Sequence, residues 1–155
     1  CKMHNVILGI LRPSLLAGKG APGNLGAMVN GVKKGYYLNI AGGRAVKSIL
    51  MAEDIARIMP AVVKKGGVYN VCDTFQPTFG QISESVANQL GKRKPMSIPM
   101  WMAKCMAFVG DFLGPKVPIN SYKLEKMTKN LTFSNEKARK ELGWEPLDVL
   151  TNYKI

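Results

Sequence analysis

The sequence predicts an α/β fold in which short strands with flanking helices are followed by a helical tail. Short apolar runs rich in β-branched residues alternate with segments whose apolar residues recur at helical spacing. Gly and Pro signals separate these segments, and from residue 100 onward the pattern is helical. At 155 residues, the chain can bury a substantial core. We therefore expect a single α/β domain over residues 1–155.

The first strand is expected at residues 6–11, a continuous apolar run closed by Arg12 and Pro13. Such a run is typical of a strand that is buried on both faces in a parallel sheet. A helix is expected over residues 24–34, ended by Gly35. Two further short strands are predicted on either side of a glycine turn, at residues 37–40 and 47–51.

A helix beginning at Glu53 contains Pro60, which is expected to kink or shorten it. Thr78 and Gln81 have the spacing of a capping box, which predicts the start of the next helix. Ser134 is expected to cap the last helix. Gly66 and Gly67 are expected to end the helix that begins at Glu53, and a strand follows at residues 68–71. The helix that begins after Thr78 is expected to run to Gly91. Further helices are predicted at residues 100–113, apolar nearly all round, and at 135–142, ended by Gly143.

The charge of the chain predicts anionic partners. It carries 22 Lys and Arg against 10 Asp and Glu, a formal net charge of +12, which attracts phosphates, nucleic acid or acidic surfaces. A small nucleic-acid-binding module is one alternative. Aromatic residues make up only 8% of the chain and do not alternate with basic residues, so nucleic acid is not an expected partner.

The cysteines Cys1, Cys72 and Cys105 are widely spaced, and His4 is the only other soft ligand. This spacing supports neither a disulfide framework nor a metal site, so buried thiols are expected. No apolar run reaches the roughly 20 residues that span a bilayer, and the opening does not resemble a signal peptide. We expect a soluble, cytoplasmic protein without a membrane partner.

Residues 18–23 spell Gly-x-Gly-x-x-Gly, the pattern of a dinucleotide-binding loop. The context differs from that of a cofactor loop, because residues 13–17 separate the motif from the predicted strand and Pro22 lies inside it. No acidic residue occurs before Glu53, whereas one is expected about 20 residues after the motif. A loop whose backbone approaches a ligand is the preferred interpretation.

Four segments together resemble the extended short-chain dehydrogenase/reductase family, the NAD-dependent epimerase/dehydratases. They are Arg-Pro-Ser-Leu-Leu-Ala-Gly-Lys-Gly at residues 12–20, the Gly-Gly-Arg segment at 42–56, Gly-Val-Tyr-Asn-Val-Cys-Asp at 67–73, and Lys-Ala-Arg-Lys-Glu-Leu-Gly-Trp-Glu-Pro at 137–146. The closest resemblance is to bacterial nucleotide-sugar 4-epimerases and 4-keto reductases of surface-polysaccharide synthesis. It implies that the chain is the carboxy-terminal, substrate-binding part of an extended Rossmann-type dehydrogenase.

The resemblance also implies what lies outside this part. The family's cofactor loop and catalytic Ser…Tyr-x-x-x-Lys set precede the Arg-Pro segment, and the chain begins with Cys1 rather than Met. We therefore expect a fragment without catalytic residues, inactive alone. Its expected partners are a nucleotide-sugar substrate and its own amino-terminal Rossmann domain, with a second copy in a homodimer as a further candidate. NAD or NADP is the expected cofactor of the full-length protein. Tyr122 and Lys126 spell a Tyr-x-x-x-Lys pair, but their place in the chain order argues against catalysis.

Eight residues are candidates for a binding site, seven from the resemblance and Lys34 from the basic charge of this part of the chain. Three are implied to lie beside the nicotinamide: Pro13, Ser14 and Leu15. Five are candidates for substrate binding: Asn24 and Lys47 at the diphosphate, Tyr37 and Asn39 where a strand passes the nucleobase, and Lys34 as a further basic contact. A helix amino terminus favours phosphate on physical grounds alone.

Alternatives remain at several of these positions. Asn24 would equally serve as a helix cap, and Lys47 as an exposed strand residue. Leu15 stands where many sugar epimerases have Asn, which permits a reductase acting on an alcohol or ketone without phosphate. The apolar helix at 100–113 would be core, a contact with another domain or second subunit, or the face of a self-associating scaffold.

Overall fold

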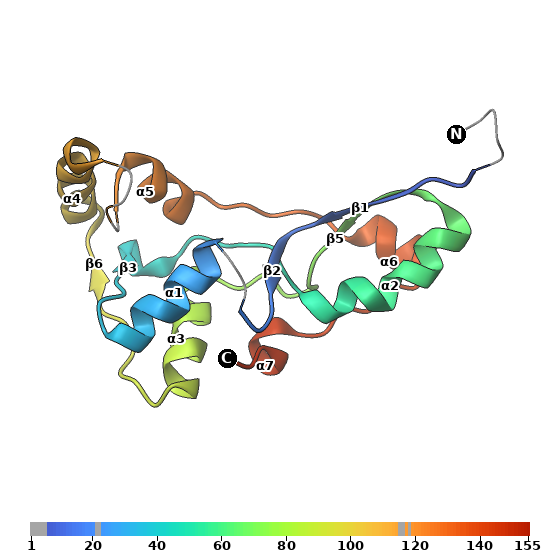
Figure 1. Cartoon of the computed structure of the whole chain (residues 1–155), viewed down its shortest axis with the longest axis horizontal. Helices are drawn as coiled ribbons and strands as arrows, with labels where there is room; N and C mark the ends of the chain where they lie inside the picture. Colours follow the sequence, from blue (N-terminus) through green and yellow to red (C-terminus); the bar gives the residue numbers. More distant parts are fainter. Residues whose placement is uncertain (1–5, 21–22, 115–116, 118) are drawn as a thin grey trace. The chain divides into compact units, whose positions relative to one another are not determined.

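The computed structural model describes residues 6–20, 23–114, 117 and 119–155. The chain divides into two compact units. The first unit comprises residues 1–21, 48–76 and 132–155, and the second comprises residues 22–47 and 77–131. A single domain was the expectation from the sequence, which carries no sign of this division. Each unit mixes helices with short parallel strands, so the predicted α/β class is confirmed (Figure 1).

The first unit contains two pairs of parallel strands. Strand β1 (Gly9–Pro13) pairs with β5 (Gly67–Val71), and β2 (Leu15–Ala17) pairs with β4 (Ile49–Met51). Helix α2 (Ala52–Lys65) connects β4 to β5. A Cβ atom on Gly9 would lie 2.4 Å from Cγ1 of Val62 in α2, so β1 needs glycine where the helix crosses it. The core of this unit contains Leu50, Ile58, Val62, Tyr69, Val71, Ala138 and Trp144.

One prediction for this unit is wrong, and one is wrong in part. The apolar run at residues 6–11 is not buried on both faces, because Val6, Ile7, Leu8 and Ile10 are exposed and β5 is the only strand paired with β1 in the described residues. Pro60 does not shorten α2, which continues for five more residues to Lys65; the alternative expectation of a kink stays a prediction. Pro60 is exposed, so its ring faces solvent and the helix loses one hydrogen bond rather than its packing. The predicted glycine end is confirmed, with Gly66 donating to the Val62 carbonyl.

The carboxy-terminal helices of the first unit are α6 (Glu136–Leu142) and α7 (Val149–Asn152). The predicted end of α6 at Gly143 is confirmed by its left-handed conformation. The hydroxyl of Ser134 accepts from the Glu136 amide at 3.3 Å, although the capping position itself belongs to Asn135. The sequence analysis missed α7, because four residues are too few to show helical periodicity.

Buried polar side chains hold this tail in place. The Asp54 carboxylate accepts from the Leu147 amide at 2.9 Å, and Asp73 accepts from the Val149 amide at 2.8 Å. The Trp144 indole and the Asn135 carboxamide both donate to the Cys72 carbonyl. The four side chains are buried, and their hydrogen bonds compensate for the cost of removing them from water.

The second unit contains α1 (Gly23–Lys34), β3 (Asn39–Ile40), the short helix η2 (Ala41–Gly43) and α3 (Phe79–Gln89). These are followed by β6 (Ser97–Ile98), α4 (Met100–Leu113) and α5 (Ser121–Thr128). Strands β3 and β6 run parallel. The capping box predicted at Thr78 and Gln81 is present, and the predicted bounds of the helix at 100–113 are confirmed. The sequence analysis missed β6, which is two residues long.

A close approach of backbones joins η2 to α3. Gly43 has φ of +64°, and a Cβ atom there would lie 2.6 Å from the amide nitrogen of Gly80. A Cβ atom on Gly80 would in turn lie 3.0 Å from the Gly42 carbonyl oxygen. The predicted glycine turn at 42–43 therefore has a second function besides reversing the chain, because it lets the start of α3 pack against it.

The cysteine prediction is confirmed for Cys72, which is buried, and wrong for Cys105, which is exposed on α4. Cys1 and His4 lie outside the described residues. Within the described residues, no helix is both long enough and apolar enough to cross a lipid bilayer.

Candidate functional site

The predicted cofactor residues Pro13, Ser14 and Leu15 lie where β1 ends and β2 begins, in the first unit. At this point the chain leaves its pairing with β5 and begins to pair with β4. The Ser14 amide donates to the Val71 carbonyl at 3.1 Å, and the Leu15 amide donates to the Ser48 carbonyl at 3.3 Å. Because proline has no amide hydrogen, none of the three backbones retains a donor for a ligand.

The Ser14 hydroxyl is therefore the polar group of these three residues that could donate a hydrogen bond to a ligand. Its oxygen is buried and has no hydrogen-bond partner among the described residues. A buried hydroxyl without a partner is costly and calls for an explanation. It lies just beyond the carboxyl end of a parallel strand, where open α/β sheets bind ligands. An amide group of a ligand could both donate to and accept from this hydroxyl, so the site fits the carboxamide of a nicotinamide.

The predicted substrate residues Asn24 and Lys34 lie at opposite ends of α1, in the second unit. Both are exposed, and ten residues of helix separate them by about 15 Å. One diphosphate therefore cannot contact both side chains. Asn24 is the second residue of α1, directly after Gly23, whose φ is +75°. The phosphate contact and the helix cap therefore both stay predictions for Asn24. The first turn contains no acidic residue, so its amide groups favour an anion.

Tyr37 and Asn39 lie in the segment that follows α1. Tyr37 is partly buried beside Gly31, where an added Cβ atom would lie 3.1 Å from that of Tyr37. Burial raises the pKa of the Tyr37 phenol to about 12. Asn39 is buried in β3, and its side-chain oxygen accepts from the Ser83 hydroxyl at 3.1 Å. The strand predicted at 37–40 is thus shortened to β3, with Tyr37 outside it.

Lys47 is buried rather than exposed, with 5% of its surface accessible. Its ammonium donates to the carbonyl oxygens of Lys126, at 2.9 Å, and Lys129. These carbonyls lie at the carboxyl end of α5, where a cation compensates for unpaired acceptors and the helix dipole. The ammonium also lies 5.2 Å from the centre of the Phe79 ring. Burial lowers the pKa of Lys47. A contact with a diphosphate would have to compete with these internal bonds.

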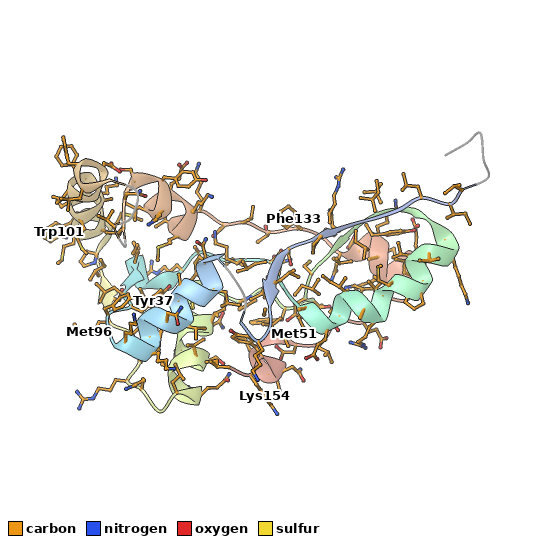
Figure 2. The ribbon with its side chains drawn as sticks, viewed as in Figure 1. Tyr37, Met51, Met96, Trp101, Phe133 and Lys154 are labelled. Atoms are coloured by element: carbon orange, nitrogen blue, oxygen red, sulfur yellow. The ribbon has the colours of Figure 1, made fainter. Side chains whose placement is uncertain are left out.

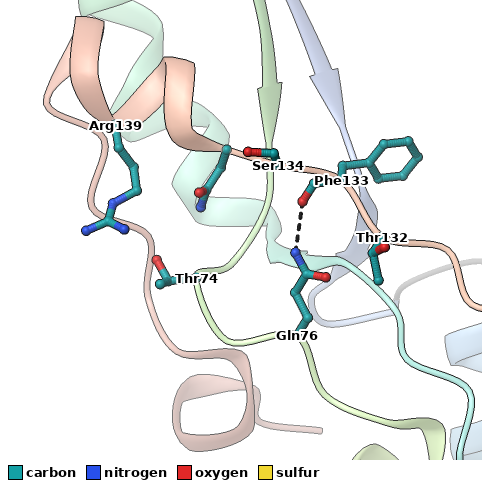
Figure 3. A pocket seen from close by; sticks show the side chains of 7 residues that line it. Thr74, Gln76, Thr132, Phe133, Ser134 and Arg139 are labelled. Atoms are coloured by element: carbon teal, nitrogen blue, oxygen red, sulfur yellow. Dashed lines mark hydrogen bonds between the residues drawn. The ribbon is translucent and has the colours of Figure 1, made fainter.

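Sequence reasoning did not find the shallow, open pocket in the first unit (Figure 3). It has a volume of about 430 Å³ and is lined by Thr74, Gln76, Thr132, Phe133, Ser134, Asn135 and Arg139. The Gln76 amide group donates to the Phe133 carbonyl at 2.8 Å, and Asn135 donates to Cys72. Internal bonds therefore occupy the Gln76 and Asn135 side chains of its lining.

Comparisons with known proteins identify the fold. No family model and no curated sequence matches the chain. A nucleoside-diphosphate-sugar epimerase from Pseudomonas aeruginosa has a TM-score of 0.68 and 19% identity, with 97% of this chain and 46% of that chain covered. A UDP-glucose 4-epimerase with UDP-glucose from Thermotoga maritima has a TM-score of 0.62 and 18% identity, with 94% and 43% of the two chains covered. The Bordetella bronchiseptica enzyme WbmG with NAD and UDP has a TM-score of 0.63 and 17% identity, with 98% and 43% of the two chains covered. The chain has the fold of nucleotide-sugar epimerases.

The predicted resemblance to the NAD-dependent epimerase/dehydratases is thereby confirmed at the level of the fold. The chain spans less than half of the length of these epimerase structures. Its activity, substrate and partners are consequently a matter for proposal, as are the roles of the eight predicted site residues.

The loop motif at residues 18–23 directly follows a strand, which the sequence did not suggest. Residues 13–17 do not merely separate the motif from a strand, because β2 ends at Ala17, directly before Gly18, and α1 begins at Gly23. One of the sequence arguments against a cofactor loop is therefore wrong. The absence of an acidic residue before Glu53 still argues against it. Residues 21 and 22 lie outside the described residues.

The Tyr122 and Lys126 pair lies on one face of α5, as its spacing predicts. The Lys126 ammonium lies 4.1 Å from the centre of the Tyr122 ring. The contact is thus with the ring, a cation–π interaction on an exposed helix surface. Among the described residues, no group of three or more His, Cys, Asp or Glu side chains could hold a metal ion.

Proposed function

We propose that the chain is the substrate-binding part of an NAD(P)-dependent nucleotide-sugar epimerase or 4-keto reductase. The supporting observation is the fold, which matches over 94–98% of the chain the structures of two epimerases and WbmG. Two of those structures were determined with UDP-glucose or with UDP. The net charge of +12 is also appropriate for a dianionic diphosphate.

In this proposal, the amino end of α1 binds the diphosphate. Asn24 would donate from its exposed carboxamide, and the free amide groups of the first helical turn would donate alongside it. Tyr37 and Asn39 would lie beside the nucleobase. Because Lys34 is at the other end of α1, it would contact a different part of the substrate from Asn24.

The junction of β1 and β2 would hold the nicotinamide of NAD or NADP. The Ser14 hydroxyl is the available polar contact for its carboxamide, since the amide hydrogens of Ser14 and Leu15 are already used. Pro13 and Leu15 would shape the apolar surroundings. When bound, the nicotinamide would supply hydride chemistry at C4 of the sugar.

The reaction would also need a general acid or base that passes a proton at the sugar hydroxyl. The family resemblance implies that a Tyr serves as this general acid or base, and that both this Tyr and the dinucleotide-binding domain precede the Arg12-Pro13 segment. We therefore propose that the chain binds and orients the substrate, is inactive by itself, and acts together with that domain in the cytoplasm.

Calorimetric titration with UDP and UDP-N-acetylglucosamine tests the proposal. Asn24→Ala is the informative variant, because Asn24 is exposed and its loss should leave the fold intact. Asn30→Ala is the matched control, since Asn30 is also exposed on α1 but away from its amino end. We expect saturable binding that weakens by about five- to twentyfold in Asn24→Ala, the loss of one charge-assisted hydrogen bond.

The control variant should bind as the unchanged protein does. Equal weakening in Asn24→Ala and Asn30→Ala, or binding that neither variant changes, would contradict the assignment of the diphosphate to the amino end of α1.

A second candidate function is a reductase that acts on an alcohol or ketone without phosphate. Leu15 favours it, because this apolar, half-buried side chain stands where many sugar epimerases have Asn. Binding of UDP distinguishes the two functions. In the reductase, NAD or NADP would still bind at Ser14, but UDP would not bind at α1.

A further inference from the structure

Helix α4 presents an apolar surface to solvent. At 100° per residue, one continuous arc of about 160° contains only apolar residues and Cys105. Eight residues form this arc, which we name the α4 face, and all are exposed: Trp101, Met102, Cys105, Met106, Phe108, Val109, Phe112 and Leu113. The Phe108 and Phe112 rings meet edge to face at 5.1 Å. Figure 2 shows Trp101 on this helix.

The opposite side of α4 fixes this orientation. Ala103, Ala107 and Gly110 are buried against the α5 region together with Leu124. A Cβ atom on Gly110 would lie 2.0 Å from the Ile119 carbonyl oxygen. The small residues therefore pack inward, and the large apolar residues face outward. This is the reverse of what a water-facing helix requires.

The two charged residues of α4, Lys104 and Asp111, lie together at one edge of the α4 face. Asp111 is turned toward α5, because its carboxylate accepts from the Ser121 amide at 3.0 Å and the Ser121 hydroxyl at 2.6 Å. No acidic side chain interrupts the α4 face. The helix has 14 residues, about 21 Å in length, which is too short to span a bilayer.

The charge of the second unit indicates what could cover this face. Residues 22–47 and 77–131 contain twelve Lys and Arg against three Asp and Glu. The second unit therefore carries nine of the twelve net positive charges of the chain. A second copy would bring another strongly basic unit to the same interface, which like-charge repulsion disfavours. An anionic surface is instead attracted. Lys92 and Arg93 are exposed shortly before β6, and Lys104 is exposed at the edge of the α4 face.

We propose that the α4 face lies in the interface of an anionic lipid membrane, parallel to its surface. Aromatic and Met side chains would enter the boundary between headgroups and acyl chains, and the basic side chains of the second unit would contact the headgroups. Such binding needs no membrane-spanning helix, so it is compatible with the lack of a spanning segment in the described residues. It differs from the expectation of no membrane partner, which considered only spanning and secretion.

The two tryptophans offer a direct reporter. Trp101 is 67% exposed and lies on the α4 face, whereas Trp144 is buried in the first unit. With vesicles of phosphatidylcholine containing 30% phosphatidylglycerol, we expect a blue shift of the Trp101 emission and its quenching by lipids brominated on the acyl chains. The Trp101→Phe variant should lose both signals while still sedimenting with the vesicles.

Surface variants separate apolar insertion from charge attraction. Phe108→Ser with Phe112→Ser should weaken vesicle binding by at least about tenfold. Val63→Ser is the matched control, because Val63 is 66% exposed, against 64% for Phe108, but lies on α2. Lys92→Gln with Arg93→Gln should weaken binding to anionic vesicles by about tenfold or more, and neutral phosphatidylcholine vesicles should bind much less of the unchanged protein.

Three outcomes would overturn the proposal. They are no binding to anionic vesicles, binding that the two Phe substitutions do not weaken, and a concentration-dependent dimer that these substitutions abolish in sedimentation equilibrium. The last would assign the α4 face to a second copy of the chain.

Discussion

The side chain of Lys47, which was expected at the surface, is buried and caps the carboxyl end of α5. Its ammonium is the donor for two carbonyl oxygens at the end of α5. Replacing it with Met keeps most of the volume but leaves both acceptors without this partner. We expect Lys47→Met to lower the free energy of unfolding by about 1–3 kcal/mol, measured by urea denaturation.

Lys33→Met is the appropriate control, because Lys33 is exposed near the end of α1 and a surface change usually alters stability by less than about 0.5 kcal/mol. If Lys47→Met unfolded like the control and instead abolished UDP binding, Lys47 would be a ligand contact rather than a structural cap.

Tyr37 predicts a change of stability at alkaline pH. Burial raises the pKa of its phenol to about 12 in the folded chain, against an ordinary value near 10 in the unfolded chain. The stabilisation is fully present below pH 10 and is lost as the pH rises through 12. Over this window the Tyr37 contribution amounts to roughly 3 kcal/mol.

Tyr37→Phe removes the titrating group. The difference between the variant and the unchanged protein, measured by denaturation at pH 8, 10 and 11.5, isolates this contribution from those of Tyr69 and Tyr153, whose pKa values burial also raises. A variant whose stability falls as steeply as that of the unchanged protein would show that Tyr37 ionises freely in the folded state.

The sequence indicated which residues could form the site, but not their burial or their hydrogen-bond partners. Ser14 was singled out by resemblance, but the sequence does not show that its hydroxyl is buried without a partner among the described residues. Nor does it show that the chain exchanges one strand neighbour for another there. The burial of Lys47 depends on residues about 80 positions further along the chain. Local patterns contain no information about such distant contacts.

At the level of elements, helices with a chemical start and stop signal were the most predictable. The capping box at Thr78 and the left-handed Gly143 each fixed one helix end. The two- to four-residue elements β3, β6 and α7 could not be located accurately, because they are shorter than the periods that reveal them. Their positions depend on tertiary contacts, such as the bond from Val149 to Asp73.

Helix α2 allows a test of how Pro60 is tolerated. The helix continues through this exposed residue, so restoring an amide hydrogen there should add a hydrogen bond without disturbing the core. We expect Pro60→Ala to raise the free energy of unfolding by about 1–2 kcal/mol, less than the intrinsic difference of about 3 kcal/mol because the unfolded chain gains freedom. A loss of stability in thermal unfolding would show that the Pro60 ring contributes packing.

At the scale of the whole molecule, the predicted fold class and family resemblance were confirmed, while the division into two units was not foreseen. The units are interleaved in the sequence, since each is built from separated segments, and no linker marks the boundary. The predicted cofactor residues fall in the first unit, and the predicted substrate residues fall in the second.

The central claim is that the chain binds a nucleotide sugar at the start of α1. Residue-resolved NMR of the ¹⁵N-labelled chain, titrated with UDP-N-acetylglucosamine, tests it most directly. We predict saturable shifts at the amides of Gly23, Asn24 and Leu25, with further shifts at Tyr37 and Asn39, and none at the α4 face. No shifts at millimolar ligand, or saturable shifts confined to other surfaces, would contradict the claim.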